Sequence, residues 1–538
     1  MKRRKFIKNV SVLAAGGSLM GSCATSSKKI PGKIIGASSA VGHLMRDGKL
    51  NSKPVSETMT VKVAVIGSGV SGLSAARQLL KNKVEDFVLL ELEPHAGGNA
   101  HSGSNDISAY PWGAHYVPLP NNDLKEYLSF LEEAGVITSY NGQGLPVYNE
   151  YHLCFAPEER LFINGLWQHG LIPNFGVGED EQQQIKRFLL LMDEFRNKKG
   201  NDGRDAFSIP VNNSSQDEVF LLLDKMSMKE WLQQNGFTSP HLHWYCNYAC
   251  RDDFGTRYDE CSAWAGIHYF AGRKGKAANA DSGDVITWPE GNGFLVKHLM
   301  KEIGSKIKTN SLVTGIKQDN NKVEIVYWDV AESLLKKVVA DFCIISTPMF
   351  ITQRLLNYDK AKSDKVHNTF HYCPWMVANI TVKELEEKRG EDLCWDNVLY
   401  ESESLGYVEA THQLVNQLTP RKNLTYYLPL TKTDPVTERK KAIEMKHEDW
   451  VKIILDDLKK VHTNIETAVE KINVMIWGHA MIQPRTNYIS GTIRKELSHS
   501  GFSNIELAHT DIAGISIFEE AFYQGINAAD SVIKKLAS

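Results

Sequence analysis

Residues 67–72 carry three glycines at the spacing of a phosphate-binding turn. In such a turn, Gly67 permits the tight bend, Gly69 lets the backbone approach a pyrophosphate, and Gly72 lets the next helix pack closely on the preceding strand. Ser68 lies in the same turn. The helix that follows would direct its free amide groups, and the positive end of its dipole, toward the phosphates. The spacing therefore predicts a site for the pyrophosphate of a dinucleotide.

Two short apolar runs flank this turn, at 63–66 and 87–90, and predict buried strands with a helix between them that ends near Lys81. Glu91 follows the second run, about 20 residues after the glycines, where a carboxylate accepts hydrogen bonds from the adenosine ribose. The order of strand, turn, helix, strand and acid predicts an α/β, Rossmann-like domain that binds the ADP half of a dinucleotide. The alternative is a glycine turn that binds nothing.

The composition is that of an ordinary globular protein. The chain has 538 residues, of which 42% are hydrophobic and 23% are charged, so it is long enough for more than one domain. The formal net charge of -3 gives no overall positive field, and we expect no nucleic-acid partner. Beyond the N-terminus, no apolar run reaches the ~18 residues of a membrane-spanning helix.

The N-terminus has the pattern of an export signal. Arg3 and Arg4 lie in a basic run that precedes an apolar stretch at 10–20, which is typical of a twin-arginine signal and assigns residues 1–27 to it. We therefore expect export through the twin-arginine pathway to the periplasm. Cys23 ends a segment that resembles a lipoprotein box, so it would be acylated and anchor the chain to a membrane; simple release into the periplasm is the alternative. Residues 28–60 are expected to form a polar linker.

The remaining cysteines provide no disulfide framework. Seven lie between Cys154 and Cys394, an odd number without regular spacing, and we expect most of them to be buried thiols. His243, Cys246 and Cys250 would share one face of a helix, which raises the alternative of a metal site. No fourth ligand is evident, so core packing is the favoured interpretation and no metal is predicted.

After the ribose-binding acid, the sequence continues with Gly97-Gly98-Asn99. In this order it resembles the flavin amine oxidase and phytoene desaturase superfamily, whose cofactor is FAD. The resemblance implies that these three residues contact FAD. It also implies that Gly113 and Ala114, further along the chain, lie beside the flavin ring. Asn99 replaces the arginine usual in this family, which leaves more of the pyrophosphate charge to backbone amides and to the helix dipole.

Later segments extend the resemblance. Residues 288–295 resemble the family's glycine turn before a helix, and Val313 stands where a valine backbone holds adenine. Residues 340–348 resemble the strand that returns to the dinucleotide domain. Near the C-terminus, Asp511 precedes a helix rich in small residues at 519–529. The resemblance implies that this acid bonds the ribityl chain and that the start of the helix faces the flavin.

The order of these segments implies two domains. Residues 61–120, 285–348 and 481–538 would form the FAD-binding domain, while 121–284 and 349–480 would form a discontinuous α+β substrate domain. The fold class expected is thus α/β, with a Rossmann-like domain interrupted by two insertions.

The two insertions differ in their residue patterns. The first is expected to be largely helical, with a capping box at Ser227 and Glu230 that starts one helix and Gly236 near its end. The second contains strand candidates around 378–382 and 425–428.

The reacting centre would lie beside the flavin ring, where four residues are candidate catalytic groups. Tyr116 matches a residue that lines the substrate cavity in amine oxidases of this family. For His115, next to it, a ring satisfied by backbone groups is the favoured interpretation, and a proton relay that titrates near neutral pH is the alternative. Trp477 and His479 are expected to form further walls. No cysteine lies at 477–490, where monoamine oxidases carry the thiol bonded to flavin, so we expect noncovalent FAD.

The leading hypothesis is an FAD-dependent oxidoreductase. It would transfer hydride from a C–N or C–C bond of a small substrate to flavin N5 and be reoxidised by oxygen or another acceptor. An amine substrate is favoured, although Ile517 stands where monoamine oxidases have one aromatic wall. A desaturase or isomerase of a lipidic substrate is the next alternative, and a flavoprotein scaffold without catalysis is the third.

Overall fold

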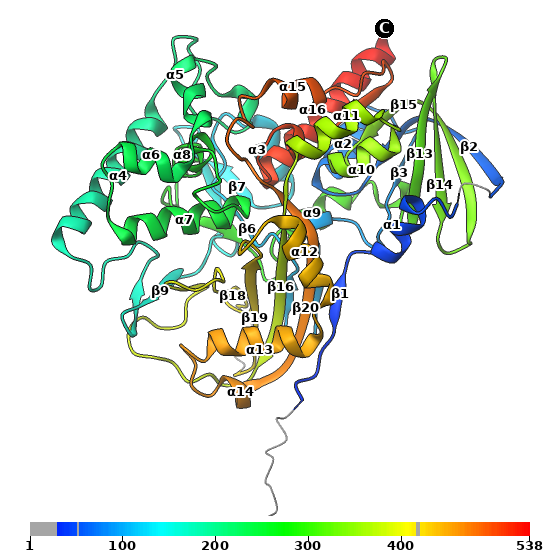
Figure 1. Ribbon diagram of the computed structural model, residues 1–538. Helices are drawn as coiled ribbons and strands as arrows, with labels where there is room; N and C mark the ends of the chain where they lie inside the picture. The colour runs from blue at the N-terminus through cyan, green and yellow to red at the C-terminus, as the bar shows by residue number, and fades with distance from the viewer. Residues whose placement is uncertain (1–28, 51–52, 416–419) are drawn as a thin grey trace, which may run out of the picture.

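Two large β-sheets frame the molecule in the computed structural model, which describes residues 29–50, 53–415 and 420–538. Figure 1 shows one sheet at the upper right and the other in the lower half, with a group of green helices on the left. The first sheet contains the residues around the glycine turn, and the second is built mainly from the two insertions, with one strand from the N-terminal segment.

The first sheet has a parallel core. Its strands there are β12 (Ile307–Lys308), β3 (Phe87–Leu90), β2 (Val55–Ile66), β15 (Leu334–Ile345) and β21 (Ile505–Leu507). The apolar runs of β2, β3 and β15 around the turn are buried, as expected for parallel strands covered on both faces. The strands predicted on either side of the turn are confirmed, and so is the α/β, Rossmann-like fold class.

Two antiparallel strands extend this sheet. β13 (Ser311–Asp319) pairs with β14 (Lys322–Asp329), and β14 pairs with the first half of β15. The first half of β2 also pairs with β15, so these two strands run through both parts of the sheet. The start of β13 lies beside the end of β3, because the Ser311 N–H donates to the Glu91 carbonyl (2.7 Å).

Two helices cross closely on this sheet. α2 (Val70–Lys81) begins directly after the glycine turn and packs against α16 (Phe518–Ala537) at the C-terminus. A Cβ atom on Gly525 would lie only 2.1 Å from the Ser71 carbonyl oxygen, so the crossing needs glycine at this position. The helix predicted to end near Lys81 is confirmed.

The second sheet joins strands of both insertions. In sheet order its strands are β1 (Ile34–Gly36), β20 (Val469–Ile482), β16 (Tyr372–Val382), β19 (Lys422–Pro429), β18 (Tyr407–Glu409), β17 (Asp396–Leu399), β9 (Glu159–Ile163) and β10 (Leu166–His169). β9 and β10 belong to the first insertion, and β16 to β20 belong to the second. β9 and β17 pair in parallel, which places Asp396 directly beside Glu159. The strands predicted in the second insertion are confirmed.

Helices cover one face of the second sheet. These are α12 (Pro435–Glu444) and α13 (His447–Leu458). Trp450, Ile454 and Leu458 of α13 join the strand residues of one buried apolar cluster.

The rest of the first insertion is largely helical, as predicted. Its main helices are α4 (Glu179–Asn197), α6 (Met228–Gln234), α7 (Pro240–Phe254) and α8 (Ala263–Ala271). The capping box at the start of α6 is confirmed: the Glu230 N–H donates to Ser227 Oγ (3.2 Å), and the Ser227 N–H donates to the Glu230 carboxylate (2.8 Å). α7 carries residues that reach the candidate site described below.

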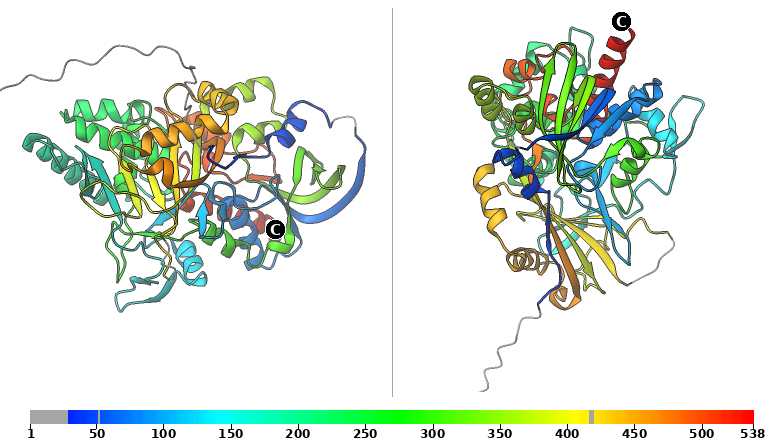
Figure 2. Two further views of the ribbon diagram at one scale, coloured as in Figure 1. Left: turned by 90° about the horizontal axis from the view of Figure 1, so that it is seen from below. Right: turned by 90° about the vertical axis from the view of Figure 1, so that its right-hand side faces the viewer.

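Residues 29–50 and 53–60 differ from the linker expected at 28–60. β1 pairs in parallel with β20 at the edge of the second sheet, and Figure 2 (right) shows this blue segment running along the lower half of the molecule. α1 (Ser39–Arg46) follows, and Ser38 donates from N and Oγ to the Glu93 carboxylate (2.8 Å each) beside the first sheet. Because an exposed strand edge has backbone groups to satisfy, the chain is held there, and the linker prediction is wrong for these residues.

The structure bears on the expected thiols but not on the expected export signal. The twin-arginine motif and Cys23 lie outside the described residues. The cysteines from Cys154 to Cys394 are buried and unpaired, as predicted. In the part of the chain that the structure describes, no helix is long and apolar enough to cross a membrane.

Candidate flavin and substrate site

The glycine turn forms an open cradle at the start of α2. Gly67 has a φ of 94°, a conformation that favours glycine, and its N–H donates to the Leu90 carbonyl (2.8 Å). A Cβ on Gly72 would lie 1.9 Å from the Gly67 carbonyl oxygen, so the helix packs directly on the turn. Gly69 is the N-cap of α2, provides no side-chain cap, and has open space where a Cβ would be. The first amides of α2 therefore remain available to phosphate oxygens.

Glu91 lies at the end of β3 and is held against the turn. Both the N–H and the hydroxyl of Ser68 donate to its Oε2 (2.7 Å each), and the Glu93 N–H donates to its Oε1 (2.8 Å). Burial raises the pKa of Glu91, and these hydrogen bonds oppose that rise. A carboxylate has about four acceptor positions, so one remains for a ribose hydroxyl.

The double glycine lies against the same turn. Gly97, in the left-handed region at a φ of 117°, donates its N–H to the Ser68 carbonyl (2.8 Å). A Cβ on Gly98 would lie 3.3 Å from the Gly69 Cα. Two glycine segments that are separated in the sequence thus approach each other backbone to backbone, and a side chain at Gly98 would press on the turn.

Asn99 connects this segment to the residues expected beside the flavin ring. Its carbonyl accepts from the Ala114 N–H (3.0 Å), and a Cβ on Gly113 would lie 2.3 Å from that carbonyl oxygen. Its side-chain amide donates to the Ala480 carbonyl. Asn99 therefore links the double glycine, the segment of Gly113 and Ala114, and β20.

The structure places Val313 near the adenosine end of the cradle. Val313 is buried in β13, two residues after the hydrogen bond that joins Ser311 to Glu91, and a β-bulge follows it before Gly315. A bulge leaves backbone groups out of the strand ladder, as a backbone contact with a base requires. Its role toward adenine remains a prediction.

Asp511 is more heavily bonded by the protein than its expected role requires. Its Oδ2 accepts from the Met349 N–H (2.8 Å) and the Tyr372 hydroxyl (2.5 Å), and its Oδ1 lies 3.0 Å from His509 Nδ1. Although burial raises it, the His509 ring and these hydrogen bonds hold the pKa of Asp511 below its usual value. A ribityl hydroxyl would have to share this carboxylate with the Tyr372 hydroxyl.

A cavity of about 170 Å³ adjoins the segment expected to lie along the flavin. Asn99, Gly113 and Ala114 line one side of it. The rest of its wall is largely aromatic and comes from six parts of the chain: His115, Tyr116, Tyr248, Trp375, Tyr427, Trp477 and Phe518. Three of the four candidate catalytic residues, Tyr116, His115 and Trp477, are therefore brought together.

Backbone hydrogen bonds fix the aromatic wall. The Tyr427 hydroxyl donates to the Gly113 carbonyl (2.9 Å), and Trp477 Nε1 donates to the Trp112 carbonyl (2.6 Å). The rings of Tyr116 and Trp395 meet edge to face with centroids 5.9 Å apart. These contacts hold the rings in defined orientations around the cavity.

His115 lies deep in this wall and does not titrate near neutral pH. Its ring centroid is 4.6 Å from that of Tyr427 and 5.6 Å from that of Trp395. Burial lowers the pKa of His115 to about 3. The Gly113 backbone also bonds the ring, so His115 fits the favoured interpretation of a histidine satisfied by backbone groups, and the alternative of a proton relay near neutral pH is not supported.

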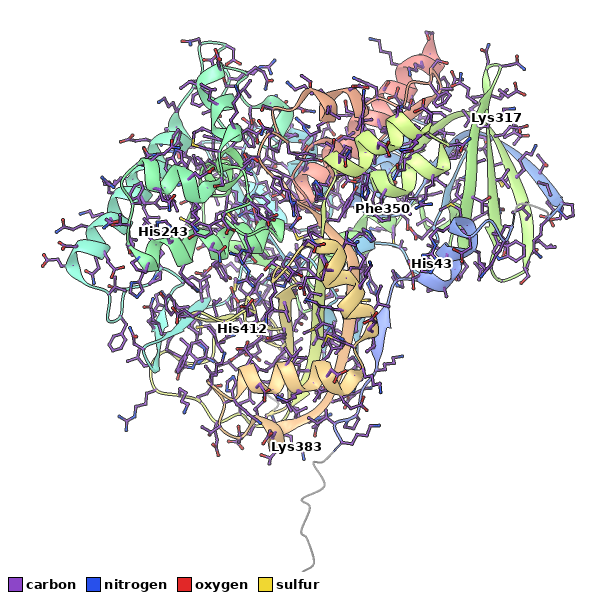
Figure 3. All side chains as sticks on the ribbon, viewed as in Figure 1. His43, His243, Lys317, Phe350, Lys383 and His412 are labelled. Carbon is purple, nitrogen blue, oxygen red and sulfur yellow. The ribbon has the colours of Figure 1, made fainter. Side chains whose placement is uncertain are left out.

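His479 lies away from the cavity. The pairing of β20 with β16 shifts between Trp477 and Met481, so the strand bulges there and its side chains no longer alternate regularly. The His479 ring stacks on Phe350, labelled in Figure 3, at a centroid distance of 4.0 Å and lies 5.7 Å from the Tyr372 ring. Burial lowers its pKa to about 3. Its expected place in the substrate wall is wrong, because the bulge turns it toward the side of Asp511.

Sequence reasoning missed the charged residues of the cavity. Asp252, Asp253, Arg273, Asp396 and Glu519 all line it. Arg273 Nη2 donates to both carboxylate oxygens of Asp253 (2.8 and 2.9 Å). Burial raises the pKa of Asp252 to about 7, that of Glu519 to about 7, and that of Asp396 well above its usual value. The cavity thus holds one closed ion pair and three further carboxyl groups.

Local sequence offers almost no signal for these residues. Asp252 lies near the end of α7 and Asp396 begins β17, and only the tertiary fold brings α7 and β17 to one cavity. Glu519 does fall inside the C-terminal motif at 519–529, where an acid at the start of a helix facing the flavin is the available signal.

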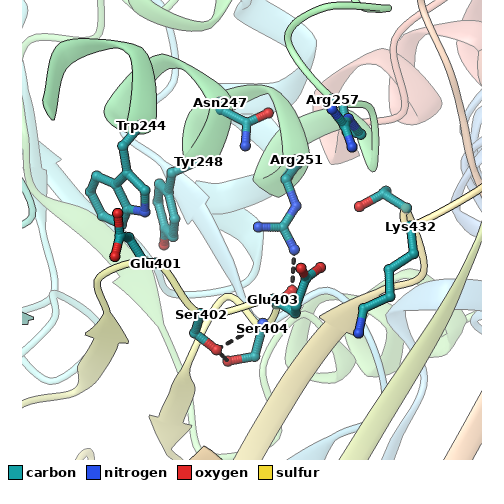
Figure 4. Close-up of a pocket in the computed structure, with 11 residues that line it drawn as sticks. Trp244, Asn247, Tyr248, Arg251, Arg257, Glu401, Ser402, Glu403, Ser404 and Lys432 are labelled. Carbon is teal, nitrogen blue, oxygen red and sulfur yellow. Dashed lines mark hydrogen bonds between the residues drawn. The ribbon is translucent and has the colours of Figure 1, made fainter. Parts of the chain in front are cut away.

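A more polar pocket of about 320 Å³ shares Tyr248 with the cavity (Figure 4). Charged side chains of both signs line it: Arg251, Arg257, Glu401, Glu403 and Lys432. Arg251 is only 7% exposed and donates to the carbonyl oxygen of Glu403. Because charges of both signs surround it, this pocket selects no single class of ligand.

The face of α7 considered for a metal belongs to the core. His243, labelled in Figure 3, bonds the Phe237 carbonyl (2.9 Å) and the Tyr258 hydroxyl (3.2 Å), and Cys246 and Cys250 are fully buried. Over the described ranges, no group of three or more His, Cys, Asp or Glu residues is arranged to hold a metal ion.

In the comparison with known proteins, one family model matches most of the chain. The family model described as flavin containing amine oxidoreductase matches residues 70–533. An L-amino acid dehydrogenase from Synechocystis sp. is 23% identical over 325 residues, which are 58% of this chain and 62% of the relative. The chain thus spans less than two thirds of that relative's length.

Two solved structures share the fold. A putrescine oxidase bound to putrescine aligns with a TM-score of 0.63 at 14% identity, covering 89% of this chain and 100% of the other. A fatty acid isomerase from P. acnes aligns with a TM-score of 0.61 at 17% identity, covering 87% of this chain and 97% of the other. Identities this low show a common architecture and do not transfer a substrate.

Proposed function

The chain belongs to the family of flavin-containing amine oxidoreductases, and from this premise we propose that it is an FAD-dependent oxidoreductase that oxidises a small amine. The observation that supports an amine is the charge of the cavity: aromatic walls enclose three carboxyl groups beyond the Asp253–Arg273 pair. Such a cavity attracts positively charged molecules and rejects anions.

The residues around the glycine turn fit an FAD molecule. The uncapped start of α2, the open space at Gly69 and the free acceptor position of Glu91 would hold the pyrophosphate and ribose. FAD, when bound, supplies a hydride acceptor at N5, which oxygen or another acceptor later reoxidises. We propose noncovalent binding, because 477–490 contains no cysteine.

The chain's own residues would orient the amine and keep water out. Tyr116 and Trp477 provide rigid aromatic walls, and the neutral His115 ring adds a third without introducing charge. The reacting nitrogen must be neutral, so an ammonium group has to lose a proton before reaction. Glu519, at the start of α16 and with its pKa raised to about 7 by burial, is a carboxyl group in the cavity that would accept this proton near neutral pH.

The cavity favours an amine over an α-amino acid. An amino acid needs a cation for its carboxylate, usually an arginine in bidentate geometry. Arg273 is the one cationic side chain among the described residues that line the cavity, and its Nη2 group donates to both carboxylate oxygens of Asp253. An α-carboxylate would therefore have to share this guanidinium with Asp253 and would face the three further acids of the cavity.

The experiment described below also distinguishes two alternatives to amine oxidation. Ile517 lines the cavity in place of an aromatic residue, which suits a lipidic substrate for a desaturase or isomerase. The other is a flavoprotein scaffold without catalysis.

The test is anaerobic mixing of the purified flavoprotein with monoamines, polyamines, amino acids and polyenes, followed by flavin absorbance. We expect amines to bleach the flavin, at a rate that rises with pH toward the pKa of the amine. Bleaching by a polyene with no pH dependence would favour the desaturase. Absence of bleaching by every compound would favour the scaffold.

Export is part of the same proposal. The twin-arginine pattern at Arg3 and Arg4 supports transport to the periplasm, where the protein would be released or anchored through Cys23.

A further inference from the structure

We propose that Asp252 and Asp396 bind a second, positively charged amino group of the substrate, so that the preferred substrate is a diamine or a longer polyamine. We call this pair the distal carboxylate site. The inference rests on the proposed amine oxidation, and it adds a site that would hold the end of the substrate away from the flavin.

The distal carboxylate site lies one tyrosine side chain away from the flavin segment. The Tyr116 backbone follows Gly113 and Ala114, which line the flavin side of the cavity, and its hydroxyl contacts the Asp252 carboxyl at the other end of the ring. Asp396 lines the same cavity from β17, and the nearby Asp252 carboxyl helps to raise its pKa. A substrate that reaches from one end to the other must therefore pass along the Tyr116 ring.

The acids of this site have no cation of their own. Within the described ranges, neither Asp252 nor Asp396 forms an ion pair, and Glu159, beside Asp396 in the paired strands, forms none either. Arg273 is near enough to lower the pKa of Asp252, but its guanidinium is hydrogen-bonded to Asp253. Burying carboxylates without partners costs free energy, which a bound cation would recover.

Protonation agrees with this picture. Burial is the main reason that the pKa of Asp252 rises to about 7, and burial likewise raises the pKa of Asp396 and of Glu159. An ammonium group between the two aspartates would lower both pKa values and favour the charged carboxylates.

An independent observation comes from Asn292, which is not an acid. Asn292 is 1% exposed and lines the same cavity. Its side-chain nitrogen donates to the Tyr116 carbonyl (3.0 Å), while its Oδ1 accepts no hydrogen bond from any described residue. A buried acceptor without a donor points to a ligand that brings N–H groups into the cavity.

The walls between the two ends suit an alkyl chain with charged ends. Tyr116, Trp395 and Tyr427 surround His115 within ring distances of 4.6–5.6 Å. Aromatic faces pack against methylene groups and attract ammonium groups. A monoamine of the same length would leave the distal carboxylate site unfilled.

The test compares amines of equal length on the flavin-loaded enzyme. For the wild type, we expect kcat/KM for putrescine to exceed that for butylamine by about tenfold to a hundredfold, the value of a hydrogen bond between charged groups. Asp252→Asn and Asp396→Asn each keep the shape of the side chain and should lower this ratio by about tenfold. Asp456→Asn, at an exposed ion pair on α13, is the matched control and should leave the ratio as it is.

A binding measurement separates this site from the reaction. Putrescine should raise the melting temperature of the wild type more than butylamine does, and the two aspartate variants should lose this difference. If either variant fails to fold, the other variant and the wild-type comparison still decide. Equal kcat/KM and equal thermal shifts for the two amines would overturn the distal carboxylate site while leaving amine oxidation intact. If no amine bleaches the flavin, amine oxidation fails, and the thermal shifts alone judge the site.

Discussion

At the scale of single residues, Glu91 has two tasks that a substitution would disturb together. It accepts three hydrogen bonds from Ser68 and Glu93, which fix the glycine turn to the end of β3. Its remaining acceptor position would be available to the proposed ribose. A loss of cofactor affinity therefore has to be separated from a loosened turn.

Replacing Glu91 with alanine should weaken FAD binding by about tenfold or more, because hydrogen bonds to a charged group contribute about 1.5–3 kcal/mol. Titration of the apoprotein with FAD, followed by flavin fluorescence, measures this. Glu91→Gln keeps a carbonyl acceptor and should lose less affinity. Unchanged affinity in Glu91→Ala would exclude the ribose role, and a large drop in melting temperature with unchanged affinity would leave only the structural one.

Asp252 should make stability depend on pH. Its pKa is about 7 in the folded protein, raised by burial from 3.8, so between these values the folded state binds the proton and the unfolded state does not. The free energy of unfolding therefore falls as pH rises from about 4 to 7, by up to about 4 kcal/mol for a single group. Urea unfolding at pH 5 and pH 8 should show a smaller decrease for Asp252→Asn than for the wild type. An equal decrease in both proteins would show that the pKa of Asp252 is not raised in the folded protein.

Single residues could be predicted where their role depends on adjacent sequence. The glycines of the turn and Glu91 belong to one contiguous unit, so spacing alone places them. Asp252 and Asp396 lie in different insertions, and their meeting depends on how β9, β17 and α7 pack, which no local pattern encodes.

At the scale of elements, the crossing of α2 and α16 joins the two ends of the cofactor motif. α2 begins at the glycine turn, and the start of α16 reaches the cavity through Ile517 to Glu519. Because the two helices are in close contact at Gly525, a shift of one helix would displace the other.

Gly525→Ala should therefore force the helices apart. Its Cβ would lie 2.1 Å from the Ser71 carbonyl oxygen, and overpacking of this kind costs about 1–3 kcal/mol. We expect a lower melting temperature together with weaker FAD binding. Gly42→Ala is the control, because it also lies in a helix but its nearest neighbour would be 3.9 Å away, so it should be neutral or stabilising by about 0.5–1 kcal/mol. If both variants are equally stable, the crossing is not tight.

Elements with a strong apolar pattern could be predicted, and short or irregular ones could not. β1 has only three residues and exists because β20 presents an edge, so nothing in its own sequence marks it. Regular strand alternation would put Trp477 and His479, two residues apart, on the same face of β20. The bulge that breaks this alternation depends on the register with β16, which the sequence of β20 does not show.

At the scale of the whole molecule, the N-terminal segment touches both sheets before the dinucleotide domain begins. β1 pairs with β20 of the second sheet, and Ser38 bonds Glu93 beside the first. Ile30 is already buried, and it lies only seven positions after Cys23. At about 3.3–3.6 Å per residue, an extended chain of this length spans about 25 Å. An acyl group on Cys23 would therefore hold the second sheet close to the membrane surface.

The location of the protein in the cell can be tested by fractionation. Cys23→Ala should move the protein from the membrane fraction to the soluble periplasm, because a lipid chain is the only anchor we propose. Cys154→Ala, which removes a buried thiol, is the control and should leave fractionation unchanged. Replacing Arg3 and Arg4 with lysine should retain the protein in the cytoplasm with either cysteine. A Cys23 variant that stays with membranes would contradict the anchor, whereas a wild type found in the soluble periplasm would establish simple release.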